Sequence, residues 1–195
     1  MKEYLLFYDS LLIRKYLSDN MGLPIAFVDD ETRHIAFYIN ALRGIGYESK
    51  HFESPDSCLI AIANGEEFAL FVIDLMMPSV GKYSAERTRD FLTTGLYLVK
   101  DIRNQDRKTP IIVFTNLNIA SIITEIQTEV AIEPNVFFIR KVDYPPHLLA
   151  EAVNALLDGK NPFSKRRGIL RRFWDSLILE PKVFGMGIDI KKLGS

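Results

Sequence analysis

Five polar residues each stand at the end of an apolar run, and their types suit phosphoryl chemistry. Asp29 and Asp30 follow "IAFV", Asp74 follows "FVI", Thr115 follows "IIVF" and Lys141 follows "VFFIR". Carboxylate oxygens are hard ligands that suit Mg²⁺, whereas an ammonium and a hydroxyl bind phosphate oxygens. The set therefore fits a site that takes a phosphoryl group, provided that the fold brings the five side chains together.

Three carboxylates in one place repel one another, and some of them would take up protons unless a cation removed that cost. A bound Mg²⁺ would do so, because it keeps several waters and bridges to phosphate oxygens. The metal and Lys141 would neutralise the oxygen charge, and the hydroxyl of Thr115 would donate one hydrogen bond. Asp74 is the candidate nucleophile, which would become an aspartyl phosphate. Any one of the five alone is more simply explained as a loop residue or helix cap, so only the whole set points to phosphoryl chemistry.

The elements that must position these residues follow a regular alternation. Strand patterns occupy residues 25–28, 47–52, 69–73, 110–114 and 135–140, and helical patterns occupy 31–46, 54–65, 95–105, 119–131 and 145–159. Strands that alternate with helices indicate a parallel sheet with helices on both faces. Four strands are nearly continuous in apolar residues, as strands covered on both faces are, and the polar second strand suits an edge. We predict an α/β fold, a flavodoxin-like doubly wound five-stranded sheet of order 2-1-3-4-5, with ligands bound at the carboxyl ends of the strands.

Composition limits the class of protein. The chain has 195 residues, 48% hydrophobic and 25% charged, which is ordinary for a globular domain. Its net charge of −1 argues against a protein that binds nucleic acid by overall charge. Cys58 is the single cysteine, so no internal disulfide can form, which fits a reducing cytoplasm. We expect a cytoplasmic protein with neither a membrane nor nucleic acid as its partner.

At these residues the chain resembles a response-regulator receiver domain, over about residues 24–159. The motifs that carry the resemblance are "FVDDE", "VIDLMMP", "VFTN" and "IRK". The resemblance implies a two-component phosphorelay protein that a histidine kinase or phosphotransfer protein phosphorylates, with Mg²⁺ as cofactor, no separate catalytic domain and output through protein contact. It implies these roles: Asp74 as phosphoacceptor, Asp29, Asp30 and the backbone carbonyl of Met76 as further metal ligands, Thr115 and Lys141 as phosphoryl-binding residues, and Phe138 as the switching aromatic. Core packing explains Phe138 equally well.

The sequence departs from the family pattern in three places. Val142 follows Lys141 where the family usually has a proline, and Asn116 replaces the usual small residue after Thr115. The loop after Asp74 is also long, with an insertion at 79–94. Three cations in it, Lys82, Arg87 and Arg89, form a candidate lid over the phosphoryl group; the alternatives are a partner-contact element and a tolerated surface insertion.

The two flanking segments are predicted to be extensions. Residues 1–23 read as a helix, and ten of the fourteen residues from Tyr4 to Leu17 are apolar, so its own domain, a second copy or a partner must cover it. Residues 160–195 read as a basic helix and a short hairpin around Glu180–Lys182, which is too short for an independent domain. A homodimer through either extension is one interpretation.

Three other functions compete with the switching receiver. A receiver-like binding module that no longer switches stays open. A phosphohydrolase of haloacid-dehalogenase type needs an acid two residues after the nucleophile, where this chain has Met76, and is excluded on that ground. DNA binding through the six basic residues between Lys160 and Arg172 would rest on charge alone.

Overall fold

The computed structural model describes residues 22–78, 81–131 and 133–163. The chain divides into two units after residue 161, and every helix and strand described here lies in the first. The predicted N-terminal helix and the predicted C-terminal helix and hairpin lie outside the described residues. Within the described ranges, no helix has both the length and the apolar character that crossing a bilayer requires.

Strands and helices alternate along the described chain as the sequence pattern predicts. The strands are β1 (Ile25–Val28), β2 (Ser49–Phe52), β3 (Leu70–Ile73), β4 (Ile111–Thr115) and β5 (Val136–Arg140). The helices are α2 (Thr32–Gly44), α3 (Pro55–Ala63), α4 (Thr94–Gln105), α5 (Ala120–Ala131) and α6 (Pro146–Leu157), with a short 3-10 helix, Lys141–Asp143, before α6.

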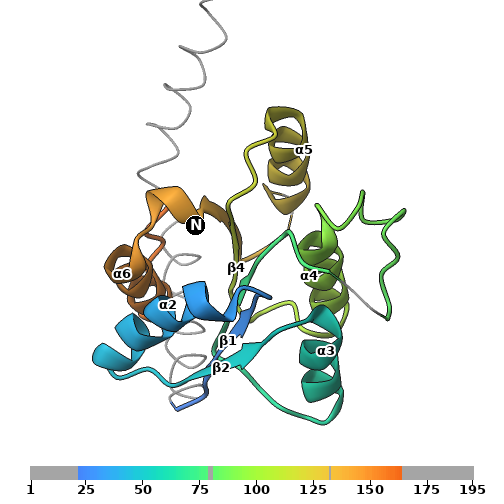
Figure 1. Cartoon of the computed structure of the whole chain (residues 1–195). Coiled ribbons are helices and arrows are strands. Elements are labelled where there is room, and N and C mark those ends of the chain that lie inside the picture. Colours follow the sequence, from blue (N-terminus) through green and yellow to red (C-terminus); the bar gives the residue numbers. More distant parts are fainter. Residues whose placement is uncertain (1–21, 79–80, 132, 164–195) are drawn as a thin grey trace, which may run out of the picture. The chain divides into compact units, whose positions relative to one another are not determined.

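The five strands form one parallel sheet in the order β2-β1-β3-β4-β5, which confirms the predicted topology and places the polar strand β2 at an edge (Figure 1). Val28 pairs with Ile73, and Ile73 pairs with Val113. This register brings the carboxyl ends of β1, β3 and β4 into line, so the residues that follow them are neighbours.

Side chains along each strand point alternately to the two faces of the sheet, and helices cover both faces. Figure 1 shows α2 and α6 on one face of the sheet and α3 and α4 on the other. Ala26 and Val28 belong to the core cluster under α3, α4 and α5. On the opposite face, Phe114 packs edge-on against Tyr38 of α2, with ring centroids 5.0 Å apart.

The start of α4 packs directly against the backbone at the end of β3. The N–H of Gly95 donates a hydrogen bond to the carbonyl of Leu75 (3.0 Å). A Cβ atom added at Gly95 would lie 1.9 Å from the carbonyl oxygen of Asp74, a separation that no side chain can have. Glycine at this position therefore lets α4 and the loop after β3 approach each other.

The insertion is anchored to the domain by a few buried side chains, although most of its residues are exposed. We call residues 81–93 the strap. Tyr83, near its start, is 2% exposed and belongs to the core cluster, and Thr88 is fully buried. The strap therefore contributes side chains to the core of the domain.

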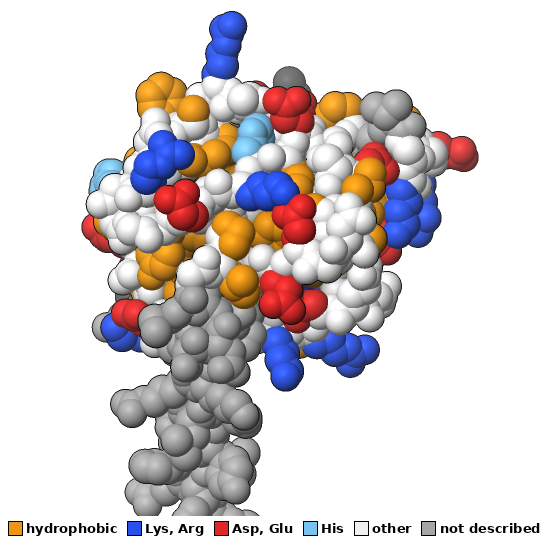
Figure 2. All heavy atoms as spheres, turned by 90° about the horizontal axis from the view of Figure 1, so that it is seen from below, with side chains coloured by type: hydrophobic (Ala, Val, Ile, Leu, Met, Phe, Trp, Pro, Cys, Tyr) orange, Lys and Arg blue, Asp and Glu red, His pale blue; other side chains and the backbone are white. Residues whose placement is uncertain are grey.

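Charged side chains are mixed on the face that is seen from below, opposite the carboxyl ends of the strands (Figure 2). Lys and Arg lie interspersed with Asp and Glu and with apolar side chains, and the coloured residues of this view form no extended basic patch. This face offers little to a polyanion such as nucleic acid.

Candidate functional site

Three carboxylates converge at the carboxyl ends of β1 and β3. One oxygen each from Asp29, Asp30 and Asp74 lies within 4.8 Å of the other two. The N–H of Asp74 donates to the carbonyl of Val28 (2.9 Å), which continues the strand ladder to the site. Asp29 and Asp74 are 2% and 4% exposed, whereas Asp30 is exposed. The site thus has a buried floor and one side open to solvent.

Lys141, which follows β5, reaches across to the same carboxylates. Its Nζ donates to Oδ2 of Asp29 (2.7 Å) and to Oδ2 of Asp74 (3.2 Å), and lies 3.8 Å from the Glu31 carboxylate. The ammonium also stands 6.0 Å from the centroid of the Phe114 ring. A buried ammonium between two buried acids is the feature that joins β1, β3 and β5 into one site.

Thr115 ends β4 beside these groups and is fully buried. Its hydroxyl oxygen accepts a hydrogen bond from the N–H of Leu117 (3.2 Å), and its side chain acts to lower the pKa of Asp74. All five polar residues that the sequence places at strand ends therefore meet in the structure.

Burial dominates the electrostatics of the site. It raises the pKa of Asp74 to about 6; the positive charge of Lys141 opposes this shift, the negative charge of Asp29 adds to it, and the hydrogen bonds from Thr115 and Lys141 oppose it. Burial also raises the pKa of Asp30, with the neighbouring acids Asp29 and Glu31 adding to it. Burial alone would lower the pKa of Lys141, but the two carboxylates overcome it and raise that pKa. The ionised forms of Asp30 and Asp74 are therefore disfavoured, and a bound cation beside them would lower both pKa values.

The donor set fits a hard divalent cation. All three acids offer oxygen, and the exposed side at Asp30 leaves room for the waters that Mg²⁺ keeps. Lys141 takes one oxygen of Asp29 and one of Asp74, while the other oxygens accept from the N–H groups of Glu31 (2.9 Å) and Leu75 (2.7 Å). These bonds fix the two carboxylates in place. Met76 lies two residues past Asp74, and the role of its carbonyl as a ligand stays a prediction.

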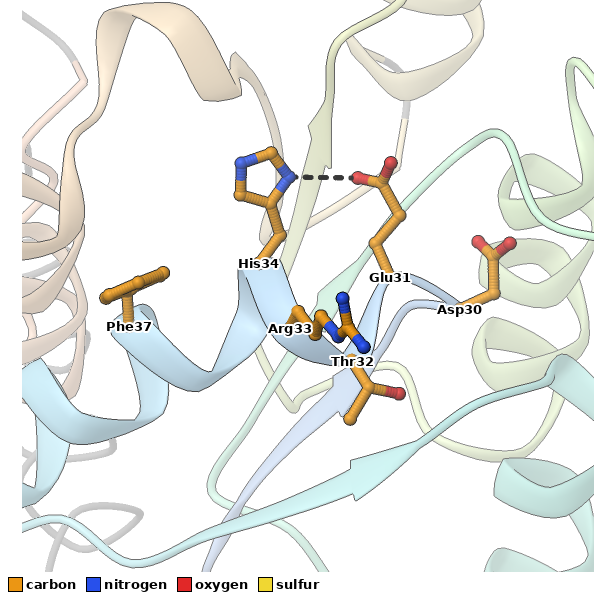
Figure 3. A pocket seen from close by; sticks show the side chains of 6 residues that line it. All are labelled: Asp30, Glu31, Thr32, Arg33, His34 and Phe37. Carbon is orange, nitrogen blue, oxygen red and sulfur yellow. Dashed lines mark hydrogen bonds and ion pairs between the residues drawn. The ribbon is translucent and has the colours of Figure 1, made fainter.

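An open pocket of about 500 Å³ adjoins the carboxylates at the start of α2 (Figure 3). It is lined by Asp30, Glu31, Thr32, Arg33, His34 and Phe37. In Figure 3 the carboxylate of Glu31 points toward His34, whose ring nitrogen lies 3.4 Å away. Asp30 belongs both to this pocket and to the carboxylate cluster, so the pocket opens directly beside the cluster.

The structure adds one residue that the sequence reasoning missed. His51, on the edge strand β2, has its ring Nε2 2.7 Å from the carbonyl oxygen of Asp29. A carbonyl only accepts, so Nε2 must carry the hydrogen. The bond fixes the backbone between the two acids of the first strand end. The bond depends on the register of β2, in which His51 pairs with Phe27, and the sequence pattern does not fix that register.

The three lid candidates lie elsewhere. The Nζ of Lys82 is 2.9 Å from Oδ2 of Asp101 on α4, and the Arg87 guanidinium is 4.8 Å from the centroid of the Tyr97 ring on the same helix. Arg89 makes two hydrogen bonds with the carboxylate of Glu125 on α5. These partners belong to α4 and α5 rather than to the carboxylate site, so a lid over the phosphoryl group stays a prediction.

The remaining predicted features lie around β5. Phe138 is half-buried and packs against the core cluster, and its part in switching stays a prediction. Among the described residues every peptide bond is trans, and the chain after Lys141 enters the 3-10 helix, with Val142 exposed. A 3-10 turn at Lys141 is how this chain accommodates valine there.

Comparison with known proteins gives a structural match alone. No family model matches the sequence, and no curated protein does so either. A CheY-like receiver domain from Methanospirillum hungatei JF-1 matches with a TM-score of 0.55 and 21% identity, over 71% of this chain and 96% of that one. The receiver domain of RcsB from Salmonella enterica serovar Typhimurium, solved with the phosphomimetic BeF3⁻, matches with a TM-score of 0.55 and 23% identity, over 71% and 91%. With its β2-β1-β3-β4-β5 sheet and its acidic cluster at the strand ends, this chain has the fold of response-regulator receiver domains.

Proposed function

We propose that the chain is a phosphoacceptor module of a two-component phosphorelay, which takes a phosphoryl group on Asp74 and signals through protein contact. The observation that carries the proposal is the ammonium of Lys141 bonded to both Asp29 and Asp74 in a cluster of three converging acids. The receiver fold supports it, as does the beryllofluoride present with the matching RcsB receiver domain. The protein would act in the cytoplasm as a phosphoacceptor rather than through a separate catalytic domain.

The transfer would run from a phosphohistidine of a kinase or phosphotransfer protein. An oxygen of Asp74 attacks phosphorus, the P–N bond breaks and its electron pair goes to the imidazole nitrogen. The ring leaves as neutral imidazole, either because the freed nitrogen gains a proton or because the other ring nitrogen already carries one. Lys141 and the Thr115 hydroxyl would bind the phosphoryl oxygens. Asp29 and Asp30 would hold Mg²⁺, whose charge would neutralise that of those oxygens. Water later cleaves the acyl phosphate, which returns the carboxylate and inorganic phosphate.

The test is chemical phosphorylation followed by intact mass. Incubation with acetyl phosphate and Mg²⁺ should give a single phosphoryl adduct, which Asp74→Asn should lose and the exposed control Asp158→Asn should keep. Beryllofluoride with Mg²⁺ should bind the wild type and not Asp74→Asn. A wild type that forms no adduct and binds no beryllofluoride would overturn the proposal.

His51 should matter for metal affinity because it fixes the backbone at Asp29. We expect His51→Leu to weaken Mg²⁺ binding on the order of tenfold, as changes to groups that orient metal ligands do. His51→Gln, whose amide can still donate to the carbonyl, should retain most of the affinity. Titration with Mg²⁺, or with Mn²⁺ as a paramagnetic probe, measures this, with Lys50→Gln on the same strand as the control. Equal losses in His51→Leu and His51→Gln would argue against the hydrogen bond as the cause.

The second candidate is a receiver-like binding module that does not switch. The packing of Phe138 against the core cluster, as an ordinary core residue, favours it. Comparing amide exchange with and without beryllofluoride separates the two: a module that binds the phosphomimetic with no change outside the site would be of the second kind.

A further inference from the structure

The strap begins tightly against α3. The N–H of Lys82 donates to Oδ1 of Asp56 in the first turn of that helix (3.1 Å). A Cβ atom at Gly81 would lie 2.7 Å from the same oxygen. The first residues of the strap are therefore held at a fixed distance from α3.

Its middle is anchored on α4. The hydroxyl of Tyr83 donates to the carboxylate of Asp101, and the ammonium of Lys82 pairs with the same carboxylate. The Thr88 hydroxyl donates back to the carbonyl of Ser84 (2.9 Å), which closes a turn inside the strap. With a buried tyrosine and a buried threonine, this part has little freedom to swing as a flap.

Its far end reaches α5. Arg89 donates through Nη1 and Nη2 to the two carboxylate oxygens of Glu125, at 3.0 and 2.6 Å. The bidentate form fixes the relative orientation of the two groups as well as their separation. Arg89, Asp90 and Phe91 all have positive φ, 53°, 55° and 69°. Three successive residues other than glycine adopt this conformation only where their surroundings hold them in it.

The helix that Arg89 holds is tied to the site by a short connection. α5 begins at Ala120, five residues after Thr115. In this structure the Thr115 hydroxyl oxygen accepts from the N–H of Leu117 within that connection. A phosphoryl group on Asp74 would give the Thr115 hydroxyl a new partner and shift Thr115. The connection, which this bond ties to Thr115, and the start of α5 would then have to adjust.

We propose that the strap acts as a brake on α5, in which the Arg89–Glu125 pair holds the helix in the position of the unphosphorylated protein. This rests on the proposed function, since the brake opposes the adjustment that phosphorylation of Asp74 would require. Both side chains are about half exposed, so the pair is modest, and we expect its loss to shift the equilibrium about two- to fivefold. The strap would thus set how readily the domain responds rather than take part in the chemistry.

The experiment compares Arg89→Gln and Glu125→Gln with the charge exchange Arg89→Glu/Glu125→Arg. Lys50→Gln is the matched control, because it breaks another exposed ion pair, Lys50–Glu66, away from the strap. Amide exchange across α5 should quicken about two- to fivefold in either single variant. Beryllofluoride should bind these variants more tightly by a similar factor at saturating Mg²⁺. The charge exchange should return both values toward wild type, and the control should change neither.

Three results would overturn the brake. They are unchanged exchange in α5, quicker exchange spread equally over the whole domain, and quicker exchange in α5 without any change in beryllofluoride affinity. A wild type that binds no beryllofluoride overturns the proposed function instead, and the exchange data then still decide whether Arg89 restrains α5.

Discussion

Replacing Gly95 with alanine should abolish Mg²⁺-dependent beryllofluoride binding and lower the free energy of unfolding by about 3 kcal/mol. The added Cβ would lie 1.9 Å from the carbonyl oxygen of Asp74, 2.8 Å from its carbonyl carbon and 2.9 Å from the Cα of Leu75. All three atoms are backbone, so no side chain can turn aside to make room. Either α4 or the end of β3 must move, and both positions support the Asp74 carboxylate.

Gly44→Ala is the matched control for this prediction. Gly44 ends α2, and a Cβ atom there would meet no other atom within 4 Å. We expect it to change the free energy of unfolding by no more than about 1 kcal/mol, on the stabilising side, and to bind beryllofluoride as the wild type does. Urea denaturation and beryllofluoride titration measure both variants. Wild-type binding by Gly95→Ala would mean that the start of α4 does not position Asp74.

Lys141→Met should cost about 3–5 kcal/mol of stability at pH 8 in the absence of Mg²⁺, because it leaves the carboxylates of Asp29 and Asp74 buried without their ammonium. Removing this positive charge should also raise the pKa of Asp74 above its value of about 6. An acid whose pKa is raised on folding favours the folded state when protonated, and this advantage disappears as the pH rises through the raised pKa. The deficit of the variant should therefore be larger at pH 8 than at pH 5.

Two further measurements separate charge from packing at Lys141. The double variant Lys141→Met/Asp74→Asn should recover much of the lost stability at pH 8, because only one buried carboxylate then remains beside the methionine. Mg²⁺ should stabilise Lys141→Met more than the wild type, since a divalent cation can partly replace the positive charge of the ammonium beside the two carboxylates. A deficit that is the same at pH 5 and pH 8 would point to the packing of the lysine stem.

The fold was predictable because its determinants are local and repeated. Each strand shows a short apolar run and each helix shows its own spacing, and their strict alternation leaves few arrangements other than a parallel sheet covered on both faces. Because the strands are parallel, the residues that follow them, among them Asp29, Asp74 and Lys141, lie together at the carboxyl ends, where ligands bind in such sheets. No contact between distant residues had to be guessed to bring the five polar groups together.

The contacts of His51 and of the strap were not predictable in the same way. The bond from His51 to Asp29 depends on the register of an edge strand that pairs on one side only. The strap has no apolar period, so its cations were assigned by proximity in sequence to Asp74. In space, Arg89 finds Glu125, 36 positions further along the chain. Which acid a flexible cation selects is decided by the path of the backbone, which the sequence pattern does not describe.

The strap begins beside Asp56 of α3, and just past its far end the N–H of Gly95 is bonded to the carbonyl of Leu75, next to Asp74. Its two ends are thus held at α3 and at the loop after β3, while Glu86 between them is exposed. Exposed loop tips of this kind accept inserted sequence well. We therefore expect a ligand-binding peptide grafted at Glu86 to leave the sheet undisturbed. Because the far end of the strap is bonded to the loop after β3, ligand binding to the graft should alter the surroundings of Asp74. The strap is thus a suitable insertion site for an engineered sensor, in which the lifetime of the acyl phosphate is the measured signal.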